Sequence, residues 1–156
     1  MNSISVLLIE DNPADADLTR EAFEANKQPV QLQVAMDGVE ALDVLHKRAG
    51  HADAREPDLV LLDLNLPRKD GRQVLAEIKS SAELRKIPVV VLSSSEDLKD
   101  VLQSYELGAN SYISKPVDFL GFQHTLRALN CFWFGTARLP SKAPRKNWTD
   151  DRNDAC

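Results

Sequence analysis

The sequence predicts an α/β fold in which a parallel sheet of five strands lies between two layers of helices. Five short apolar runs alternate along the chain with five stretches of helical periodicity, and this alternation is typical of a parallel sheet with right-handed crossovers. Two of the runs contain a continuous apolar stretch, as expected of strands that are covered on both faces. With 156 residues, 43% of them hydrophobic, the chain has the size and apolar content of one folded domain.

The composition also excludes several classes of protein. There are 19 Lys and Arg against 24 Asp and Glu, a net charge of −5, which argues against nucleic acid as the main ligand. No apolar run approaches the roughly 18 residues of a membrane-spanning helix. The N-terminus lacks the basic start of a signal peptide. We therefore expect a soluble, cytoplasmic protein that binds neither nucleic acid nor membrane.

The five expected strands differ in their patterns. The run 4–9 is rich in branched residues, and 30–34 alternates apolar with polar residues, as in a half-buried or edge strand. The runs 58–64 and 88–92 are the two continuous apolar ones, and 111–114 is shorter. Each run is followed by a helical pattern, so each strand is expected to lead into a helix.

The helices have recognisable starts and apolar stripes. Asn12 and Pro13 form a good start for the first helix, since Asn caps free amides and Pro suits the first position. Asp15 and Asp17 follow in the first turn, where the helix dipole favours acids. A weaker helix is expected over 39–49. The remaining stripes are Val74, Leu75 and Ile78, then Leu98, Val101, Leu102 and Tyr105, and finally Phe119, Phe122, Leu126, Leu129 and Trp133.

Polar residues follow the expected strands at the edge where a site would lie. In open α/β sheets, ligands bind outside the carboxyl ends of the strands. The first strand ends at Glu10 and Asp11, the third at Asp63, the fourth at Ser93 and the fifth at Lys115. Three carboxylates, a hydroxyl and an ammonium group are therefore expected to lie close together.

This set of groups suits phosphoryl chemistry. Clustered carboxylates repel one another, and Mg²⁺, which prefers oxygen ligands, removes that conflict. A lysine adds a mobile positive charge for a phosphoryl oxygen. The combination favours in-line attack by an aspartate on an activated phosphoryl group, with the developing charge stabilised by positioned electrostatics.

The same residues resemble the receiver domains of two-component response regulators. The pair Glu10-Asp11, the run Asp63-Leu64-Asn65-Leu66-Pro67, the hydroxyl of Ser93 and the pair Lys115-Pro116 occur in the order found in that family. The resemblance covers residues 4 to about 130 and implies a flavodoxin-like fold with strand order 2-1-3-4-5. It also implies that Asp63 is the phosphoacceptor and that a sensor histidine kinase supplies the phosphoryl group.

The resemblance implies roles for the other residues too. Glu10 and Asp11 match the acids that bind Mg²⁺ together with Asp63, and Asn65 matches the position that offers its backbone carbonyl to the metal. Lys115 matches the lysine that pairs with the phosphoryl group.

Two further positions match the switch of the family. Ser93 corresponds to the hydroxyl that moves toward the phosphoryl group, and Tyr112 to the aromatic residue that follows it. Such a protein catalyses at most its own phosphorylation and dephosphorylation, and it acts by changing protein contacts around the fourth helix, fifth strand and fifth helix.

A finer resemblance concerns the end of the chain. The long loop 46–57 and the aromatic ending around Phe132 and Trp133 resemble single-domain receivers that partner phytochrome-type histidine kinases. We expect a receiver domain over 1–134 and an arm or tail over 135–156, with no separate output domain. Phe132 and Trp133 are candidate contacts of a homodimer formed through the last helix and the arm.

Three other functions compete with this interpretation. An aspartate-nucleophile phosphohydrolase needs an acid two residues after the nucleophile, and here that residue is Asn65. A nucleotide-binding module needs a glycine-rich turn after the first strand, whereas this chain has Asp11-Asn12-Pro13. A receiver fold that serves as an interaction platform without phosphorylation is the third alternative, against which the complete acid set argues.

Overall fold

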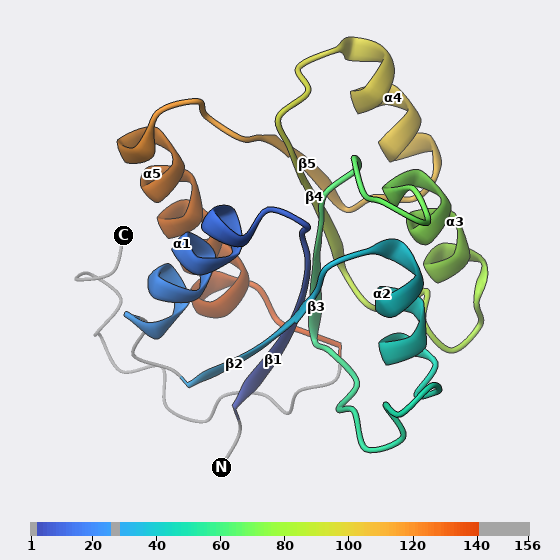
Figure 1. The fold of residues 1–156 in the computed structure, drawn as a ribbon. Coiled ribbons are helices and arrows are strands. Elements are labelled where there is room, and N and C mark those ends of the chain that lie inside the picture. The colour runs from blue at the N-terminus through green and yellow to red at the C-terminus, as the bar shows by residue number, and fades with distance from the viewer. Residues whose placement is uncertain (1–2, 26–28, 141–156) are drawn as a thin grey trace.

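A computed structural model describes residues 3–25 and 29–140. Five parallel strands form one sheet in the order β2-β1-β3-β4-β5, which confirms the flavodoxin-like topology. The sheet lies between two layers of helices (Figure 1). The strands are β1 (Ile4–Ile9), β2 (Val30–Ala35), β3 (Leu59–Leu62), β4 (Val89–Ser93) and β5 (Ser111–Ser114).

The helices are divided between the two faces of the sheet. On one face, α1 packs against α5, and α5 continues into a turn of π-helix, η1 (Figure 1). On the other face, α2 packs against α3, and α4 lies beside β5. The helices are α1 (Pro13–Glu24), α2 (Gly38–Leu45), α3 (Gly71–Ser80), α4 (Leu98–Glu106), α5 (Phe119–Asn130) and η1 (Cys131–Thr136).

An Asn or Asp side chain caps the start of every α-helix from α1 to α5. Each of these side chains accepts a hydrogen bond from a backbone N–H of the first turn, which would otherwise have no partner inside the helix. The caps fix the helix starts close to the carboxyl ends of the strands. The capping residues are Asn12, Asp37, Asp70, Asp97 and Asp118.

The core lies on both faces of the three central strands. Every residue of β1, β3 and β4 is buried, as the apolar runs predict. One cluster of buried side chains packs α2 and α3 against the sheet, and a second packs α1, α5 and η1 against the opposite face. In the second cluster, Phe23 of α1 meets Phe134 of η1 edge to face, with ring centroids 5.4 Å apart.

The structure differs from the sequence prediction at several element ends. The helix expected over 39–49 ends at Leu45, because Lys47 and Ala49 adopt left-handed backbone with φ of 55° and 52°. The last apolar stripe continues beyond α5 into η1, so Trp133 lies outside the α-helix.

The apolar stripe of α4 is the clearest difference in packing. The spacing of Leu98, Leu102 and Tyr105 correctly predicts a helix, but these side chains are 66%, 54% and 48% exposed. The buried residue of this helix is Ser104, whose hydroxyl donates to the backbone oxygen of Asp100 at 2.8 Å. The apolar face of α4 is therefore turned away from the core.

Candidate functional site

Four charged residues expected to converge do so at the carboxyl edge of the sheet. Glu10 and Asp11 follow β1, Asp63 follows β3, and Lys115 follows β5. One carboxylate oxygen from each of the three acids lies within 4.8 Å of the other two. Glu10 and Asp63 are only 3% and 8% exposed, whereas Asp11 reaches the surface. The parallel strands thus place three acids in one partly buried cluster.

The Lys115 ammonium group joins this cluster through three carboxylates. Its Nζ lies 2.5 Å from Oε2 of Glu10, 3.2 Å from Oδ2 of Asp63 and 3.2 Å from Oδ2 of Asp15. Burial lowers the pKa of the ammonium group, but the hydrogen bond that it donates to Glu10 and the three negative charges outweigh burial and raise that pKa. Lys115 therefore carries its positive charge at every physiological pH.

The buried carboxyl of Glu10 shows why the cluster suits a cation. The pKa of Glu10 is raised to about 7, and burial is the largest cause; the hydrogen bond from Lys115 opposes this rise, and the charge of Asp63 contributes to it. A divalent cation between the three acids would remove this penalty on the ionised form. The donor set is oxygen only, which is the set that Mg²⁺ and Mn²⁺ prefer. The residues present therefore fit a hard divalent cation.

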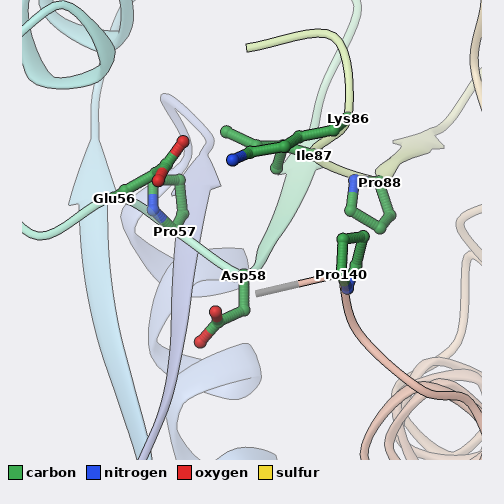
Figure 2. A pocket seen from close by; sticks show the side chains of 7 residues that line it. All are labelled: Glu56, Pro57, Asp58, Lys86, Ile87, Pro88 and Pro140. Carbon is green, nitrogen blue, oxygen red and sulfur yellow. The ribbon is translucent and has the colours of Figure 1, made fainter. Parts of the chain in front are cut away.

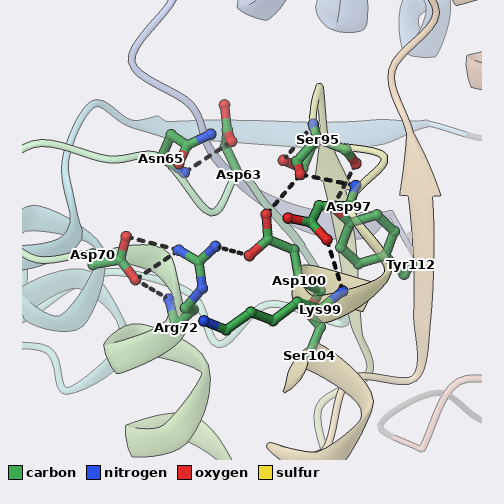
Figure 3. Close-up of polar contacts among 11 residues, drawn as sticks. Asp63, Asn65, Asp70, Arg72, Ser95, Asp97, Lys99, Asp100, Ser104 and Tyr112 are labelled. Atoms are coloured by element: carbon green, nitrogen blue, oxygen red, sulfur yellow. Dashed lines mark hydrogen bonds and ion pairs between the residues drawn. The ribbon is translucent and has the colours of Figure 1, made fainter. Parts of the chain in front are cut away.

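The turn after β3 fixes the backbone of Asp63. Its N–H donates to the carbonyl oxygen of Ile9 at 3.0 Å, and its Oδ1 accepts the N–H of Asn65 at 3.1 Å (Figure 3). Gly71 closes the loop by donating its N–H to the carbonyl oxygen of Leu64 at 2.8 Å. A Cβ at Gly71 would lie 2.3 Å from the carbonyl oxygen of Asp63, so only glycine allows this close approach.

Ser93 and Tyr112 each form a hydrogen bond with the loop between β4 and α4. Ser93 is fully buried, and its Oγ accepts the N–H of Ser95 at 3.3 Å. The half-buried Tyr112 donates its hydroxyl to the carbonyl oxygen of Ser95 at 2.7 Å (Figure 3). The backbone N–H of Tyr112 donates to the Tyr105 hydroxyl of α4 at 3.1 Å. Both predicted switch residues thus contact one loop residue, Ser95.

A polar network that the sequence analysis missed holds the same loop. Asp100 of α4 accepts the Ser95 hydroxyl at 2.6 Å and pairs with the Arg72 guanidinium at 2.5 Å (Figure 3). The Ser95 hydroxyl and Arg72 lower the pKa of Asp100 below its usual range. Arg72 also pairs with Asp70, the cap of α3. No sequence pattern indicates this network, because it depends on the tertiary structure that brings Arg72 of α3 next to Asp100 of α4.

A small pocket lies at the opposite, amino edge of the sheet. Its lining residues are Glu56, Pro57, Asp58, Lys86, Ile87, Pro88 and Pro140 (Figure 2). The buried Asp58 accepts the N–H of Ser5 at 2.8 Å and donates its own N–H to the Ser5 carbonyl oxygen at 2.7 Å. These bonds join the starts of β1 and β3, so Asp58 stabilises the sheet.

The two predicted dimer contacts lie in η1. Phe132 is 52% exposed, whereas the half-buried Trp133 packs against the core cluster beneath α1 and α5. Their rings meet edge to face, with centroids 5.1 Å apart. Of the expected arm over 135–156, residues 141–156 lie outside the described part of the chain.

In the described ranges, no helix is long and apolar enough to cross a membrane.

Comparisons with known proteins agree with this geometry. The family model of the response regulator receiver domain matches residues 6–127. Response regulator Rcp1 of Synechocystis sp. (strain ATCC 27184 / PCC 6803 / Kazusa) is 40% identical over 136 residues, which make up 87% of this chain and 92% of Rcp1. The structure of the Mn²⁺-bound form of Rcp1 has a TM-score of 0.86 at 39% identity, covering 88% of this chain and 99% of that one.

Two further solved structures are similar. The phosphorylated cyanobacterial phytochrome response regulator RcpA has a TM-score of 0.88 at 44% identity, covering 90% of this chain and all of that one. The bacteriophytochrome response regulator AtBRR has a TM-score of 0.68 at 42% identity, covering 90% of this chain and 99% of that one. Both the sequence and the fold are thus shared over nearly the whole length of these relatives.

Proposed function

Since the chain belongs to the response regulator receiver domain family, we propose that it is a phosphorylation switch whose phosphoacceptor is Asp63. The phosphoryl group comes from the phosphohistidine of a sensor kinase. The observation that carries this proposal is the convergence of Glu10, Asp11, Asp63 and Lys115 at one edge of the sheet. A carboxylate that lies beside two other acids and an ammonium group is placed to act as a nucleophile toward phosphorus.

The proposed transfer is a single in-line displacement. A carboxylate oxygen of Asp63 attacks phosphorus, so an O–P bond forms while the P–N bond of the phosphohistidine breaks. The electron pair of the P–N bond stays on the imidazole nitrogen, which takes a proton from solvent. Lys115, 3.2 Å from the Asp63 carboxylate, balances charge on an equatorial phosphoryl oxygen.

We infer that the cation of this site is Mg²⁺, held by Glu10, Asp11, Asp63 and the backbone carbonyl of Asn65. When bound, it supplies positive charge that offsets the charge of the phosphoryl oxygens. The oxygen-only donor set and the raised pKa of Glu10 support this assignment. The Mn²⁺-bound form of Rcp1 indicates that a relative binds a divalent cation.

The site favours a switch over an enzyme that turns over a phosphate ester. A phosphohydrolase of the aspartate-nucleophile type needs a proton donor two residues after the nucleophile. Asn65 occupies that position, and an amide does not act as an acid at neutral pH. Catalysis by this chain is then limited to its own phosphorylation and dephosphorylation.

The output surface that we propose comprises α4, β5 and the start of α5. Exposed apolar side chains gather on these elements and on the loop between β5 and α5; they are Leu98, Leu102, Tyr105, Val117, Phe119 and Leu120. Tyr112 of β5 and Tyr105 of α4 connect this surface to Ser95 and Ser93. A shift of Ser93 toward the phosphoryl group would therefore change how α4 and β5 meet a partner protein.

The proposed kinase is of the phytochrome type, and the proposed location is the cytoplasm. RcpA and AtBRR are described as phytochrome and bacteriophytochrome response regulators, and they are 44% and 42% identical to this chain.

We further propose a homodimer that includes Phe132 and Trp133 and residues 135–156. The exposed Phe132 ring supports this surface, and sedimentation of Phe132→Ala against wild type tests it.

The central experiment is phosphorylation by phosphoramidate, a small donor that contains the P–N bond of phosphohistidine, followed by intact-mass measurement. With Mg²⁺ we expect one added phosphoryl group on the wild type. The adduct should be absent in Asp63→Asn and after chelation of the metal. Asp17→Asn is the matched control, because it removes an exposed acid of α1 without touching the cluster, and it should react as the wild type does.

A second arm uses an autophosphorylated phytochrome-type kinase as donor. Transfer of phosphate from the kinase to the wild type, but not to Asp63→Asn, is the expected result. If neither phosphoramidate nor the kinase adds mass to the wild type, the phosphoacceptor proposal is wrong. Binding of the same partners by unphosphorylated wild type and Asp63→Asn would then favour an interaction platform independent of phosphorylation.

A further inference from the structure

We propose that Asp15 is a positioning residue for Lys115, which it holds where the incoming phosphoryl oxygen will lie. The proposal rests on the function proposed above and adds a fourth carboxylate to the site. The Oδ2 atom of Asp15 lies 3.2 Å from Nζ of Lys115, which is 100 residues further along the chain. An acid in the first turn of a helix is usually explained by the helix dipole alone, and this contact goes beyond that explanation.

The position of Asp15 is fixed by the start of α1. The Oδ1 atom of Asn12 accepts the N–H of Ala14 at 2.9 Å and that of Asp15 at 3.2 Å. The first turn is therefore anchored directly after the acidic pair Glu10-Asp11, which follows β1. Lys115 is equally fixed, because its N–H donates to the carbonyl oxygen of Ser93 at 2.7 Å. The contact thus joins two anchored backbones through one ion pair.

The three carboxylates around Lys115 differ in what else they can bind. Glu10 and Asp63 belong to the group of acids whose oxygens lie within 4.8 Å of one another, and Asp15 does not. When Glu10 and Asp63 bind a cation and a phosphoryl group, their oxygens are no longer fully available to Lys115. Among the described residues that contact its ammonium group, Asp15 is then the carboxylate left to hold it.

Holding the ammonium group matters because lysine has a long and flexible side chain. Four rotatable bonds must be fixed before Nζ can meet a phosphoryl oxygen, and a positioned partner fixes them before the donor arrives. Displacement of a catalytic group by about 1 Å can slow a reaction up to about 100-fold. Lys115 keeps its β5 anchor without Asp15, so we expect a smaller effect, on the order of tenfold.

Asp17 provides a control for the loss of one negative charge from α1. It lies two residues further along α1, it is exposed, and it is not among the partners of Lys115. Asp15→Ala and Asp17→Ala remove the same charge from the same helix. A difference between the phosphorylation rates of these two variants therefore reports the contact with Lys115 rather than the loss of one charge.

The test compares the phosphorylation rate constant at saturating phosphoramidate and Mg²⁺ in these variants. We expect about a tenfold decrease in Asp15→Ala, no more than a twofold change in Asp17→Ala, and partial rescue in Asp15→Asn, whose amide oxygen still accepts a hydrogen bond. Equal rates in Asp15→Ala and Asp17→Ala would overturn the proposal. A wild type that accepts no phosphoryl group would instead refute the proposed function of the site.

The ammonium signal of Lys115 in nitrogen-15 NMR gives a readout independent of the reaction. Its assignment comes from the signal that disappears in Lys115→Met. We expect the signal to move toward that of a free lysine and its protons to exchange faster with water in Asp15→Ala, with the wild-type signal kept in Asp17→Ala. An unchanged signal in Asp15→Ala would show that Asp15 does not hold the ammonium group.

Discussion

Replacing Gly71 with alanine tests whether the close contact between α3 and the β3 loop positions the phosphoacceptor. The added Cβ would lie 2.3 Å from the carbonyl oxygen of Asp63 and 2.6 Å from Cα of Leu64. Both are backbone atoms, so no side-chain rotation relieves the contact. The loop or the start of α3 must move by about 1 Å to reach ordinary contact distance.

The change in the free energy of unfolding caused by Gly71→Ala has two parts, one from packing in the folded protein and one from the unfolded chain. Overpacking a well-filled site destabilises a protein by about 1–3 kcal/mol. Alanine restricts the unfolded chain more than glycine does, which offsets about 0.4–1 kcal/mol. We therefore expect Gly71→Ala to lower the free energy of unfolding by about 1–2 kcal/mol, and the Tm by about 3–8 °C for a domain of this size.

The assay combines thermal unfolding with the rate of phosphorylation by phosphoramidate. The displaced backbone belongs to Asp63 itself, so we expect the rate to fall about tenfold or more even at temperatures where Gly71→Ala is fully folded. Gly135→Ala is the matched control, because no atom lies within 4 Å of a Cβ at Gly135. This control should keep the wild-type rate and Tm.

The decisive comparison is between the two alanine variants. If Gly71→Ala unfolds at the wild-type temperature and reacts at the wild-type rate, the contact with Asp63 does not position the phosphoacceptor. A loss of stability with an unchanged rate would mean that the loop adjusts without moving the Asp63 carboxylate. Either result would refute the inference from backbone contact to reactivity.

Three further predictions concern other parts of the structure. The pKa of Glu10 rises from 4.5 to about 7 on folding, so the folded protein binds more protons than the unfolded chain in this window. With the metal removed by a chelator, the contribution of Glu10 to the free energy of unfolding therefore falls as the pH rises from 4.5 to 7. Glu10→Gln should remove this fall, and urea titrations at several pH values would detect the difference. Asp100→Asn breaks the ion pair with Arg72 and should speed amide hydrogen exchange in the loop between β4 and α4; unchanged exchange would contradict a restraining role. Phe134→Ala should cost about 3–5 kcal/mol of stability and Phe132→Ala less than about 0.5 kcal/mol, because Phe134 is 2% and Phe132 52% exposed; similar losses in both would refute this assignment.

Most of the fold could be predicted because its signals are local. The capping residue Asn12 directly precedes the first residue of α1, and the continuous apolar runs of β3 and β4 identify strands covered on both faces. The element ends were predicted less well. Helix α2 ends at Leu45 because the backbone of Lys47 adopts the left-handed conformation. A glycine at this position would have indicated that conformation in the sequence, whereas a lysine does not.

The cluster of acids could be predicted for a different reason. Glu10, Asp63 and Lys115 each end a strand, and parallel strands bring their carboxyl ends to one edge whatever the details of packing. The role of Asp15 could not be predicted in this way. In the sequence, Asp15 and Asp17 both fall near the expected start of the first helix, and only the tertiary structure, which brings Lys115 next to Asp15, distinguishes them.

The sequence by itself determined the order of the elements, the start of the first helix and the side chains at the carboxyl edge of the sheet. Each of these depends on neighbouring residues or on strand direction. The tertiary structure decided which partners meet, namely Asp15 with Lys115 and Arg72 with Asp100, and it decided that the apolar stripe of α4 is exposed. Periodicity defines one face of a helix, but what covers that face is set by elements distant in the chain.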